Sequence, residues 1–555
     1  MSRFTDRLYE TAALSDRGMV TGEPGYPLRR TWNQLHHLAQ RMAGALAPHA
    51  GAGAKVAVLS ADPAEVAPVV QAIWMRAAAA TILQQPTPRL DLAHWQTETG
   101  RVLQMIEANV LVIGASFDAA ALPHNLSATV VRVDDLASGP QIAPLIPEEN
   151  SVALLQLSSG STGDPKAVVI THRNLHANIS AIIERSGFGS STEEVAISWL
   201  PLSHDMGMIA LLAMPMMCGA ELISITPAAF LNNPLLWAEL ISRYRGTYTG
   251  APNFAYSLLG NRLERTPDEH SLDLSSIRYA INGAEPVDCE AMTRFTEQAA
   301  RFGWPATALA PCYGLAEAVV AVSGTEPGRG LCTDRIDPQK LQNNQLAVCS
   351  SDGQQYAVLG SPLTGFEVRV VDPETGASLD TRRVGEFELR GESITEALLT
   401  AQGLVPAQDP EGWLRTGDIG YLTPAGELVI CGRRKDVIII SGRNLYPTDI
   451  ERAAERVDGV RLGNVVAVSV AAATPAESFV VLAESVNHGD EGQAVRLRRE
   501  ISMEVFKAIG VPPRTVVILA PGSLPKTTSG KLRRARVRAL TALSSTSRCV
   551  FSAES

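Results

Sequence analysis

The segment LSSGSTGDPK, residues 157–166, joins one apolar run to another, AVVI, at residues 167–170. Glycine leaves backbone N–H groups accessible and hydroxyls add donors, so a loop of this composition between strands can wrap a polyphosphate. The segment lacks the pattern G-x-x-x-x-G-K-[ST], which excludes an ordinary P-loop. A polar surface turn explains the composition equally well. The candidate phosphate-binding residues are Ser158, Ser159, Gly160, Ser161, Thr162, Gly163 and Lys166.

Apolar strand-like runs alternate with helix-like stretches on both sides of this loop. Such alternation indicates βαβ units and a mainly parallel sheet. The expected strands lie at residues 55–59, 110–113, 128–133, 167–170, 196–200, 221–225 and 279–281, and the expected helices lie at 64–80 and from Arg173 onward. The most apolar stretch, residues 209–220, contains Pro215 and is short for a membrane span, so we expect a buried core segment there.

The pattern changes after about residue 359, where short alternating strands are separated by turn residues. These strands, at 366–371, 385–390 and 427–431, indicate an antiparallel or barrel-like portion. Beyond the charged cluster at 433–436, strands at 437–440, 465–470, 479–482 and 515–519 indicate a compact α+β unit. We therefore predict an α/β protein with three parts. They are a large N-terminal domain (1–434) of two mainly parallel α/β subdomains plus a small β-barrel-like portion, a small mobile α+β domain (435–542) and a disordered tail (543–555).

Composition narrows the class of protein. The 555 residues include 45% apolar and 19% charged residues, as in a globular protein with a large core. Lysine plus arginine is 48 against 58 for aspartate plus glutamate, so the net charge of −10 argues against a nucleic-acid binder. The seven cysteines are scattered without a C-x-x-C spacing, and the N-terminus lacks a secretory pattern. We expect a cytoplasmic protein with reduced thiols and no membrane span.

Two further motifs carry a carboxylate. In RTGD, residues 415–418, Asp418 follows a tight turn and suits a ribose diol, although a turn-capping aspartate is commoner in isolation. In YGLAE, residues 313–317, Tyr313 can stack on a purine and Glu317 can hold a magnesium ion. A core tyrosine and an ordinary glutamate at a helix start fit that motif equally well.

A late basic motif, PKTTSGKLRR at residues 525–534, places Lys531 directly after Gly530. A lysine is a compact cation that can bridge a carboxylate and a phosphate while charge builds between them. A solvated basic patch explains the same residues when the motif is taken alone.

All four motifs occur together with WLPLSHDMG (199–207), NGAEPV (282–287) and GRRKDVIIISGRNLYPTDIE (432–451). As a set they resemble the adenylate-forming superfamily, which contains acyl-CoA synthetases, luciferases, peptide-synthetase adenylation domains and fatty-acyl-AMP ligases. The resemblance covers nearly the whole chain.

The sequence is most similar to the fatty-acyl-AMP ligases within that superfamily. WLPLSHDMGMI resembles their WLPLYHDMGLI, with Ser203 in place of the usual aromatic residue. Residues of about 326–358 correspond to the insertion that the resemblance associates with poor use of CoA. The segments GAPNFAY, NGAEPVDCEAMTRF and APGSLPKTTSGKLRR are also similar to the mycobactin-type mycobacterial long-chain-fatty-acid–acyl-carrier-protein ligases.

The resemblance implies an ATP- and Mg²⁺-dependent ligase that works in two half-reactions. A long-chain fatty acid is first activated to an acyl-AMP with release of pyrophosphate. The acyl group then passes to the phosphopantetheine thiol of an acyl carrier protein, or of a carrier domain in a polyketide or nonribosomal peptide synthase.

The resemblance also implies a role for each matching residue. Lys531 is the catalytic lysine, Glu317 holds magnesium, and Lys435 is the hinge about which the small domain rotates. The implied nucleotide-binding residues, besides the 158–166 loop, are Gly283, Ala284, Glu285, Tyr313, Gly314, Asp418 and Arg433. His204, Met206 and Gly207 lie where the family lines its acyl pocket. A packing role explains His204 equally well, and most of the methionine-rich stretch 206–217 suits a core helix.

Three alternatives remain at this point. A long-chain acyl-CoA synthetase shares every ATP motif. An amino-acid-adenylating domain is less well supported, because no acidic anchor for an α-amine is evident. A catalytically silent scaffold is expected to lack Lys531, Glu317 or Asp418, and all three are present.

Overall fold

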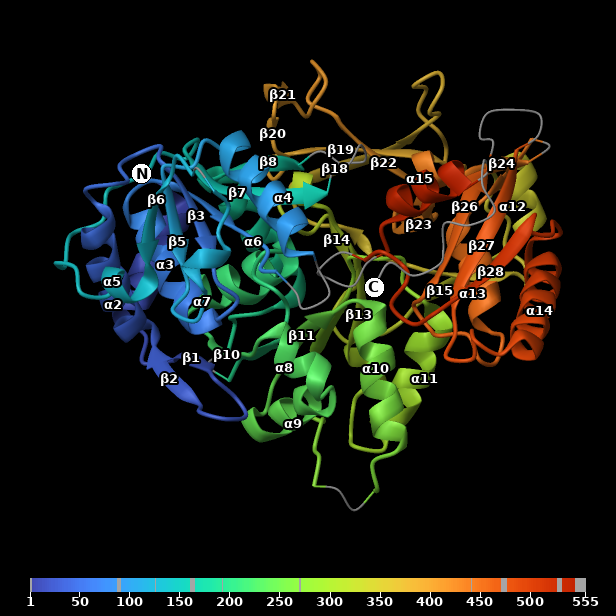
Figure 1. The fold of residues 1–555 in the computed structure, drawn as a ribbon, viewed down its shortest axis with the longest axis horizontal. Coiled ribbons are helices and arrows are strands. Elements are labelled where there is room, and N and C mark those ends of the chain that lie inside the picture. The colour runs from blue at the N-terminus through green and yellow to red at the C-terminus, as the bar shows by residue number, and fades with distance from the viewer. Residues whose placement is uncertain are drawn as a thin grey trace.

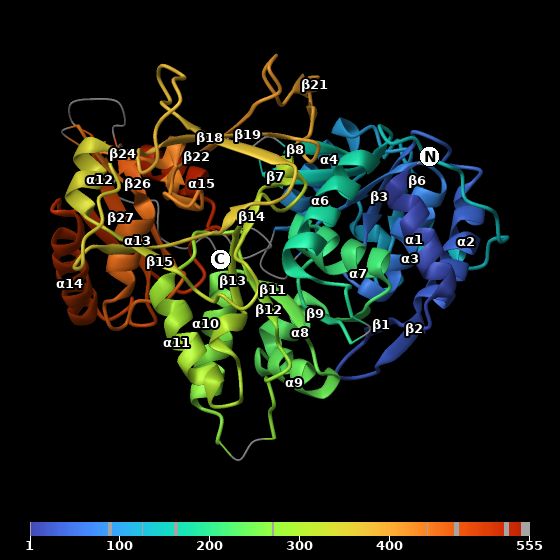
Figure 2. The same ribbon diagram turned by 180° about the vertical axis from the view of Figure 1, so that it is seen from behind.

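The computed structural model describes residues 2–86, 91–124, 126–159, 165–191, 193–268, 271–440, 442–470, 477–526 and 532–544. Figures 1 and 2 show the N-terminal elements at one end of the molecule and the C-terminal elements at the other. We call residues up to Arg433 the large lobe and residues 434–544 the small lobe.

The first sheet of the large lobe has nine strands, and its central strands are parallel. Its order is β17 (Ser361–Pro362), β14 (Ser323–Gly324), β13 (Leu309–Tyr313), β12 (Tyr279–Asn282), β11 (Tyr248–Ala251), β9 (Val195–Ser198), β10 (Glu221–Ser224), β1 (Gly18–Thr21) and β2 (Leu28–Thr31). The helices α8 (Pro227–Asn232), α9 (Leu235–Tyr244), α10 (Asn253–Glu264) and α11 (Cys289–Ala300) connect its strands.

The second sheet has eight strands and is parallel from β7 to β6. Its order is β21 (Gly403–Pro406), β20 (Ala397–Thr400), β8 (Pro165–Thr171), β7 (Val152–Ser159), β4 (Ala79–Ile82), β3 (Lys55–Leu59), β5 (Val110–Ile113) and β6 (Thr129–Arg132). The accompanying helices are α1 (Arg3–Leu14), α2 (Trp32–Leu46), α3 (Pro63–Met75), α4 (Leu92–Met105), α5 (Val133–Leu136) and α6 (His172–Ser186).

An antiparallel sheet lies between these sheets and the small lobe (Figure 1). It has the order β18 (Phe366–Val371), β19 (Gly385–Gly391), β22 (Leu414–Leu422) and β23 (Leu428–Arg433). The segment predicted as an insertion forms β15 (Thr333–Ile336), α12 (Pro338–Asn344) and β16 (Gln354–Ala357), and its two strands pair antiparallel.

The small lobe has its own sheets and its own apolar core. After η5 (Arg434–Asp436) it contains β24 (Ile438–Ile440), β25 (Arg443–Leu445), α13 (Pro447–Glu455), β26 (Val465–Val470), β27 (Ser478–Glu484), α14 (Glu491–Ile509), β28 (Thr515–Leu519) and α15 (Arg534–Ser544). The α/β fold class predicted from the sequence is confirmed. Residues 545–555 of the predicted tail lie outside the described residues.

The methionine-rich segment is a buried helix, as predicted. It consists of a π-helical part, η2 (Met206–Ala213), followed by α7 (Met214–Cys218). Every residue of η2 is buried, so this helix lies in the core and presents no polar face to water. In the part of the chain that the structure describes, no helix combines the length and apolar character needed to cross a bilayer.

The predicted C-terminal end of one helix is wrong. The helix predicted for 64–80 stops at Met75, and residues 79–82 form β4 instead. Alanine favours helix, but Ala79 and Ala80 pair with Lys55 and Val56 of β3. Tertiary pairing therefore overrides local propensity in this alanine run.

We predict that two buried histidines make the stability of the large lobe sensitive to acid. Burial lowers the pKa of His36 on α2 and of His172 on α6 to about 4 each. In the unfolded chain a histidine titrates at about 6.5, so the unfolded state alone gains a proton as the pH falls from about 6.5 to about 4. Full stability is therefore present above pH 6.5 and is lost below it.

We expect His36→Gln to reduce the loss of unfolding free energy between pH 7 and pH 5 by about 2 kcal/mol. Urea unfolding at the two pH values measures this loss. The neighbouring His37 is exposed, so His37→Gln is the matched control and should leave the difference nearly unchanged. An equal pH dependence in wild type and His36→Gln would contradict the prediction.

Candidate functional site

The site forms where two parallel strands of the nine-stranded sheet end. Asn282 of β12 lies opposite Pro311 of β13, so the chain leaves both strands at the same edge of the sheet. NGAEPV begins at the end of β12, and YGLAE begins at the end of β13. A Cβ on Gly283 would lie 2.7 Å from Sγ of Cys312, so a larger residue would displace this cysteine side chain where the two segments approach closely.

A buried carboxylate joins the large sheet to the antiparallel sheet. The hydroxyl of Tyr313 donates to Oδ2 of Asp418 at 2.6 Å, and Nε of Arg433 lies 2.9 Å from Oδ1. Asp418 and Arg433 are paired residues on β22 and β23. Burial raises the pKa of Asp418, while the charge of Arg433 and the hydrogen bond from Tyr313 act against this rise. A carboxylate has about four acceptor positions, so Asp418 can still accept hydrogen bonds from a diol.

A second carboxylate lies near the first. Glu317 is on the short 3₁₀ turn η4 (Ala316–Ala318), and its charge raises the pKa of Asp418. Nζ of Lys166 lies 3.0 Å from Oε1 of Glu317. The structure thus brings together the predicted magnesium ligand and the lysine of the predicted phosphate loop. Sequence reasoning missed this contact, because the two residues are 151 positions apart.

The backbone around Glu317 is tightly constrained. A Cβ on Gly314 would lie 1.7 Å from the carbonyl oxygen of Val320, which excludes any other residue there. Val319 has φ +71°, a rare conformation for a β-branched side chain. Strained residues of this kind persist only where their surroundings determine them, and they cluster at functional sites.

The predicted phosphate loop is the connection of a β-hairpin. Strands β7 and β8 pair antiparallel, with Ser158 opposite Lys166 and Ser159 opposite Pro165. Gly160, Ser161, Thr162 and Gly163 lie outside the described residues, as does Lys531. Their roles stay predictions from the sequence.

The loop 283–288 contains three predicted nucleotide contacts, Gly283, Ala284 and Glu285. Ala284 is exposed and has φ +72°. Oε1 of Glu285 accepts from the backbone N–H of Phe254 at 3.2 Å, so this carboxylate also caps the start of α10. Nδ2 of Asn253, the first residue of α10, also donates to the carbonyl oxygen of Pro286 in this loop. Sequence reasoning missed this contact, for which an asparagine at a helix start after Pro252 was the available signal.

The three predicted acyl-pocket residues lie at the start of η2. Nε2 of Gln156 on β7 donates to the carbonyl oxygen of Ser203 at 2.8 Å, which holds the preceding turn. Met206 is buried, and a Cβ on Gly207 would lie 2.4 Å from the carbonyl oxygen of Pro201. Gly207 is thus required for packing, and His204 is half-buried on the turn itself.

The insertion segment contacts both lobes. The hydroxyl of Tyr356 donates to Oδ2 of Asp449 on α13 at 3.0 Å, and Gln354 donates to the other oxygen. Burial raises the pKa of Asp449 to about 6. Arg443 of β25 donates to the side-chain oxygen of Gln342 at 2.5 Å. Polar contacts therefore connect the insertion to the small lobe at two places. The predicted hinge residue, Lys435, lies in η5, where the chain passes between the lobes.

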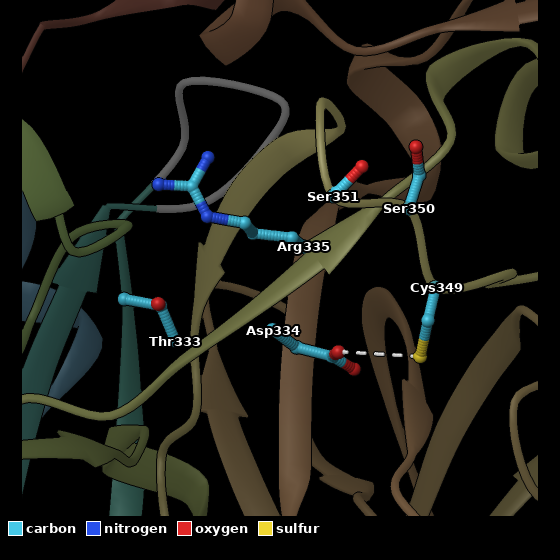
Figure 3. A pocket seen from close by; sticks show the side chains of 6 residues that line it. All are labelled: Thr333, Asp334, Arg335, Cys349, Ser350 and Ser351. Carbon is cyan, nitrogen blue, oxygen red and sulfur yellow. Dashed lines mark hydrogen bonds between the residues drawn. The ribbon is translucent and has the colours of Figure 1, made fainter.

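The insertion also carries a surface pocket (Figure 3). Its lining residues are Thr333, Asp334, Arg335, Cys349, Ser350 and Ser351. Sγ of Cys349 lies 3.9 Å from Oδ1 of Asp334, whose other oxygen accepts from the hydroxyl of Tyr421 at 3.0 Å. These contacts make Asp334 a structural link between the insertion and β22. None of the six residues that line the pocket is among the predicted site residues.

Comparison with known proteins agrees with this geometry. The AMP-binding enzyme family matches residues 10–399. The chain belongs to the AMP-binding enzymes. It is 47% identical to the putative ligase Rv1013 of Mycobacterium tuberculosis over 96% of this chain and 99% of that protein. It is 32% identical to the long-chain-fatty-acid–AMP ligase FadD26 of Mycobacterium marinum over 92% and 91% of the two chains.

A solved structure from work on fatty acyl-adenylate ligases of E. coli and L. pneumophila is also similar. It shares 27% identity and a TM-score of 0.88 with this AMP-binding enzyme, over 99% of each chain. The predicted superfamily and the prediction of an AMP-binding ligase are thereby confirmed. The narrower likeness to mycobactin-type ligases stays a prediction.

The residues at the site fit a magnesium ion that is bound mainly by its nucleotide. Magnesium is commonly held by one or two carboxylates together with substrate phosphates. Glu317 supplies one such carboxylate, partly exposed and next to Lys166. Among the described residues, no group of three or more His, Cys, Asp or Glu side chains could hold a metal ion by itself.

Tyr313→Phe removes the hydrogen bond that stabilises the charged form of Asp418, so it raises the pKa of this carboxyl further. If ionised Asp418 accepts the ribose hydroxyls, we expect nucleotide binding to fail at a higher pH in the variant than in the wild type. ATP dissociation constants between pH 5 and pH 8 measure the shift. Tyr279→Phe is the control, because its hydroxyl donates to a backbone carbonyl, that of Thr325. Superimposable profiles for Tyr313→Phe and wild type would disprove this role.

Proposed function

We propose that this AMP-binding enzyme activates a long-chain fatty acid with ATP and passes the acyl group to a phosphopantetheine thiol on a carrier protein. The observation that carries the proposal is the meeting of Asp418, Tyr313 and Arg433 with the Glu317–Lys166 pair at one sheet edge. The likeness to a long-chain-fatty-acid–AMP ligase over most of both chains supports the choice of substrate.

The first half-reaction faces an electrostatic barrier, because a carboxylate must approach a polyphosphate. An oxygen of the fatty acid attacks the α-phosphorus, and the bond to the bridging oxygen breaks so that pyrophosphate leaves. Magnesium, when bound by Glu317 and the phosphates, supplies charge neutralisation there. Lys166 and Lys531 add positive charge near the phosphates, and Asp418 orients the ribose.

In the second half-reaction a thiol sulfur attacks the acyl carbon of the mixed anhydride. The carbon–oxygen bond to AMP breaks, AMP leaves with the electron pair, and the thiol proton passes to solvent. Positioning of the reacting groups supplies much of the acceleration in such transfers. The resemblance associates the insertion with poor use of CoA. The contacts of Gln354 and Tyr356 with Asp449 hold this insertion against the small lobe, and so they support a carrier protein over CoA as the acceptor.

The proposal is tested with a panel of fatty acids, by measuring pyrophosphate release with ATP and magnesium. We expect release with long-chain acids, and we expect Lys531→Ala to slow it by about 100- to 1000-fold while ATP binding stays close to wild type. Lys507→Ala removes an exposed lysine of α14 and is the control for loss of charge. The proposal fails if wild-type enzyme releases no pyrophosphate with any fatty acid.

The acceptor is tested by giving the wild-type enzyme a phosphopantetheinylated carrier protein and CoA in parallel. We expect thioester on the carrier protein and little on CoA. The double variant Gln354→Ala, Tyr356→Phe loosens the insertion from Asp449 and should increase the CoA thioester relative to wild type. If the wild type formed equal amounts of thioester on CoA and on the carrier protein, the result would favour the interpretation of this protein as an acyl-CoA synthetase instead.

A further inference from the structure

Within the large lobe, the side chain of Asn253 makes several contacts with the loop 283–288. Nδ2 of Asn253 donates to the carbonyl oxygen of Pro286 at 2.5 Å, and Oδ1 of the same amide accepts from the N–H of Asp288 at 3.2 Å. Asn282 also donates to Oδ1 at 3.0 Å. Both ends of the loop are therefore tied to the start of α10.

A second contact on this loop comes from the small lobe. Nη2 of Arg452, on α13, donates to the carbonyl oxygen of Val287 at 2.8 Å. The carboxylates of Asp288 and Asp449 attract the same guanidinium from the two lobes. Asp288 in turn caps α11 by accepting from the N–H groups of Glu290 and Ala291 at 3.0 Å. One arginine thus connects α13 to the point where the loop enters α11.

The loop needs such support, because part of it is strained. Ala284 has φ +72° and is exposed, so side-chain packing around it contributes little to this conformation. A non-glycine residue holds a left-handed conformation only where neighbouring contacts determine it. Asn253 and Glu285 make contacts at this loop within the large lobe, and Arg452 makes one across the lobes.

We propose that Arg452 is a positioning residue of the small lobe, which holds the loop 283–288 in its nucleotide-binding form and makes nucleotide affinity depend on the docking of α13. The proposal rests on the proposed function, in which Gly283, Ala284 and Glu285 of this loop contact the nucleotide. It gives the position of the small lobe a direct effect on ATP binding, separate from any group that the lobe supplies to the reaction.

A neighbouring ion pair provides a matched control. Nε of Arg456 lies 3.6 Å from Oε2 of Glu290, and both side chains are more than half exposed. Exposed pairs of this kind contribute little because water screens them and side-chain entropy opposes them. Arg456 directly follows α13 and so links the end of this helix to α11, and among the described residues its ion pair is with Glu290 and not with the loop.

The first test is hydrogen–deuterium exchange on the full nucleotide-free chain, comparing wild type with R452Q, R452K and R456Q. We expect R452Q to speed exchange in residues 283–291 several-fold, R452K to lie between R452Q and wild type, and R456Q to match wild type. Wild-type exchange in R452Q, or the same increase in R456Q, would overturn the proposal. If R452Q does not fold, R452K carries the test, and wild-type exchange in R452K then overturns the proposal.

The second test is ATP binding and turnover by the same proteins. We expect the ATP dissociation constant and the KM for ATP of R452Q to rise about tenfold, as for one charge-assisted hydrogen bond, with kcat close to wild type. A fall in kcat with unchanged KM would overturn the positioning role. If wild-type protein binds no ATP, the proposed function fails, whereas the exchange result still reports separately whether Arg452 holds the loop.

Discussion

A carboxylate buried between two sheets has to be paired, and Asp418 meets this requirement with groups from two other strands. Tyr313 at the end of β13 and Arg433 on β23 supply the partners. Leaving a buried charge without its partner costs about 3–5 kcal/mol. The hydrogen bond from Tyr313 therefore links the antiparallel sheet to the nine-stranded sheet, and the charge of Glu317 also acts on Asp418 there.

Helix α13 has a comparable role between the lobes. Asp449 and Arg452 are three residues apart and so lie on one face of this helix. Asp449 accepts from Tyr356 of the insertion, and Arg452 donates to the carbonyl of Val287 beside the loop 283–288. The insertion and one wall of the proposed nucleotide site thus both depend on how the same helix is docked.

Residue identity at several site positions follows from close approach rather than from chemistry. Gly314 and Gly207 each face a backbone carbonyl that a Cβ would overlap. A larger residue at either position would displace the backbone that presents the neighbouring groups. A motif match at Gly207 therefore says more about packing than about contact with a substrate.

Local pattern alone established the α/β class, about half of the strands and the four motifs, because apolar periodicity and turn residues act over a few neighbouring positions. The strand at 366–371 was predicted with its observed bounds, whereas the helix at 64–80 was too long because β4 pairs with β3. The Lys166–Glu317 pair, the burial of Asp418 between Tyr313 and Arg433, and the contact of Arg452 with Val287 were decided by tertiary structure. These partners are separated by about a hundred residues or more, except Asp418 and Arg433, which pair across adjacent strands. Only packing of the sheets and lobes brings such groups within hydrogen-bonding distance.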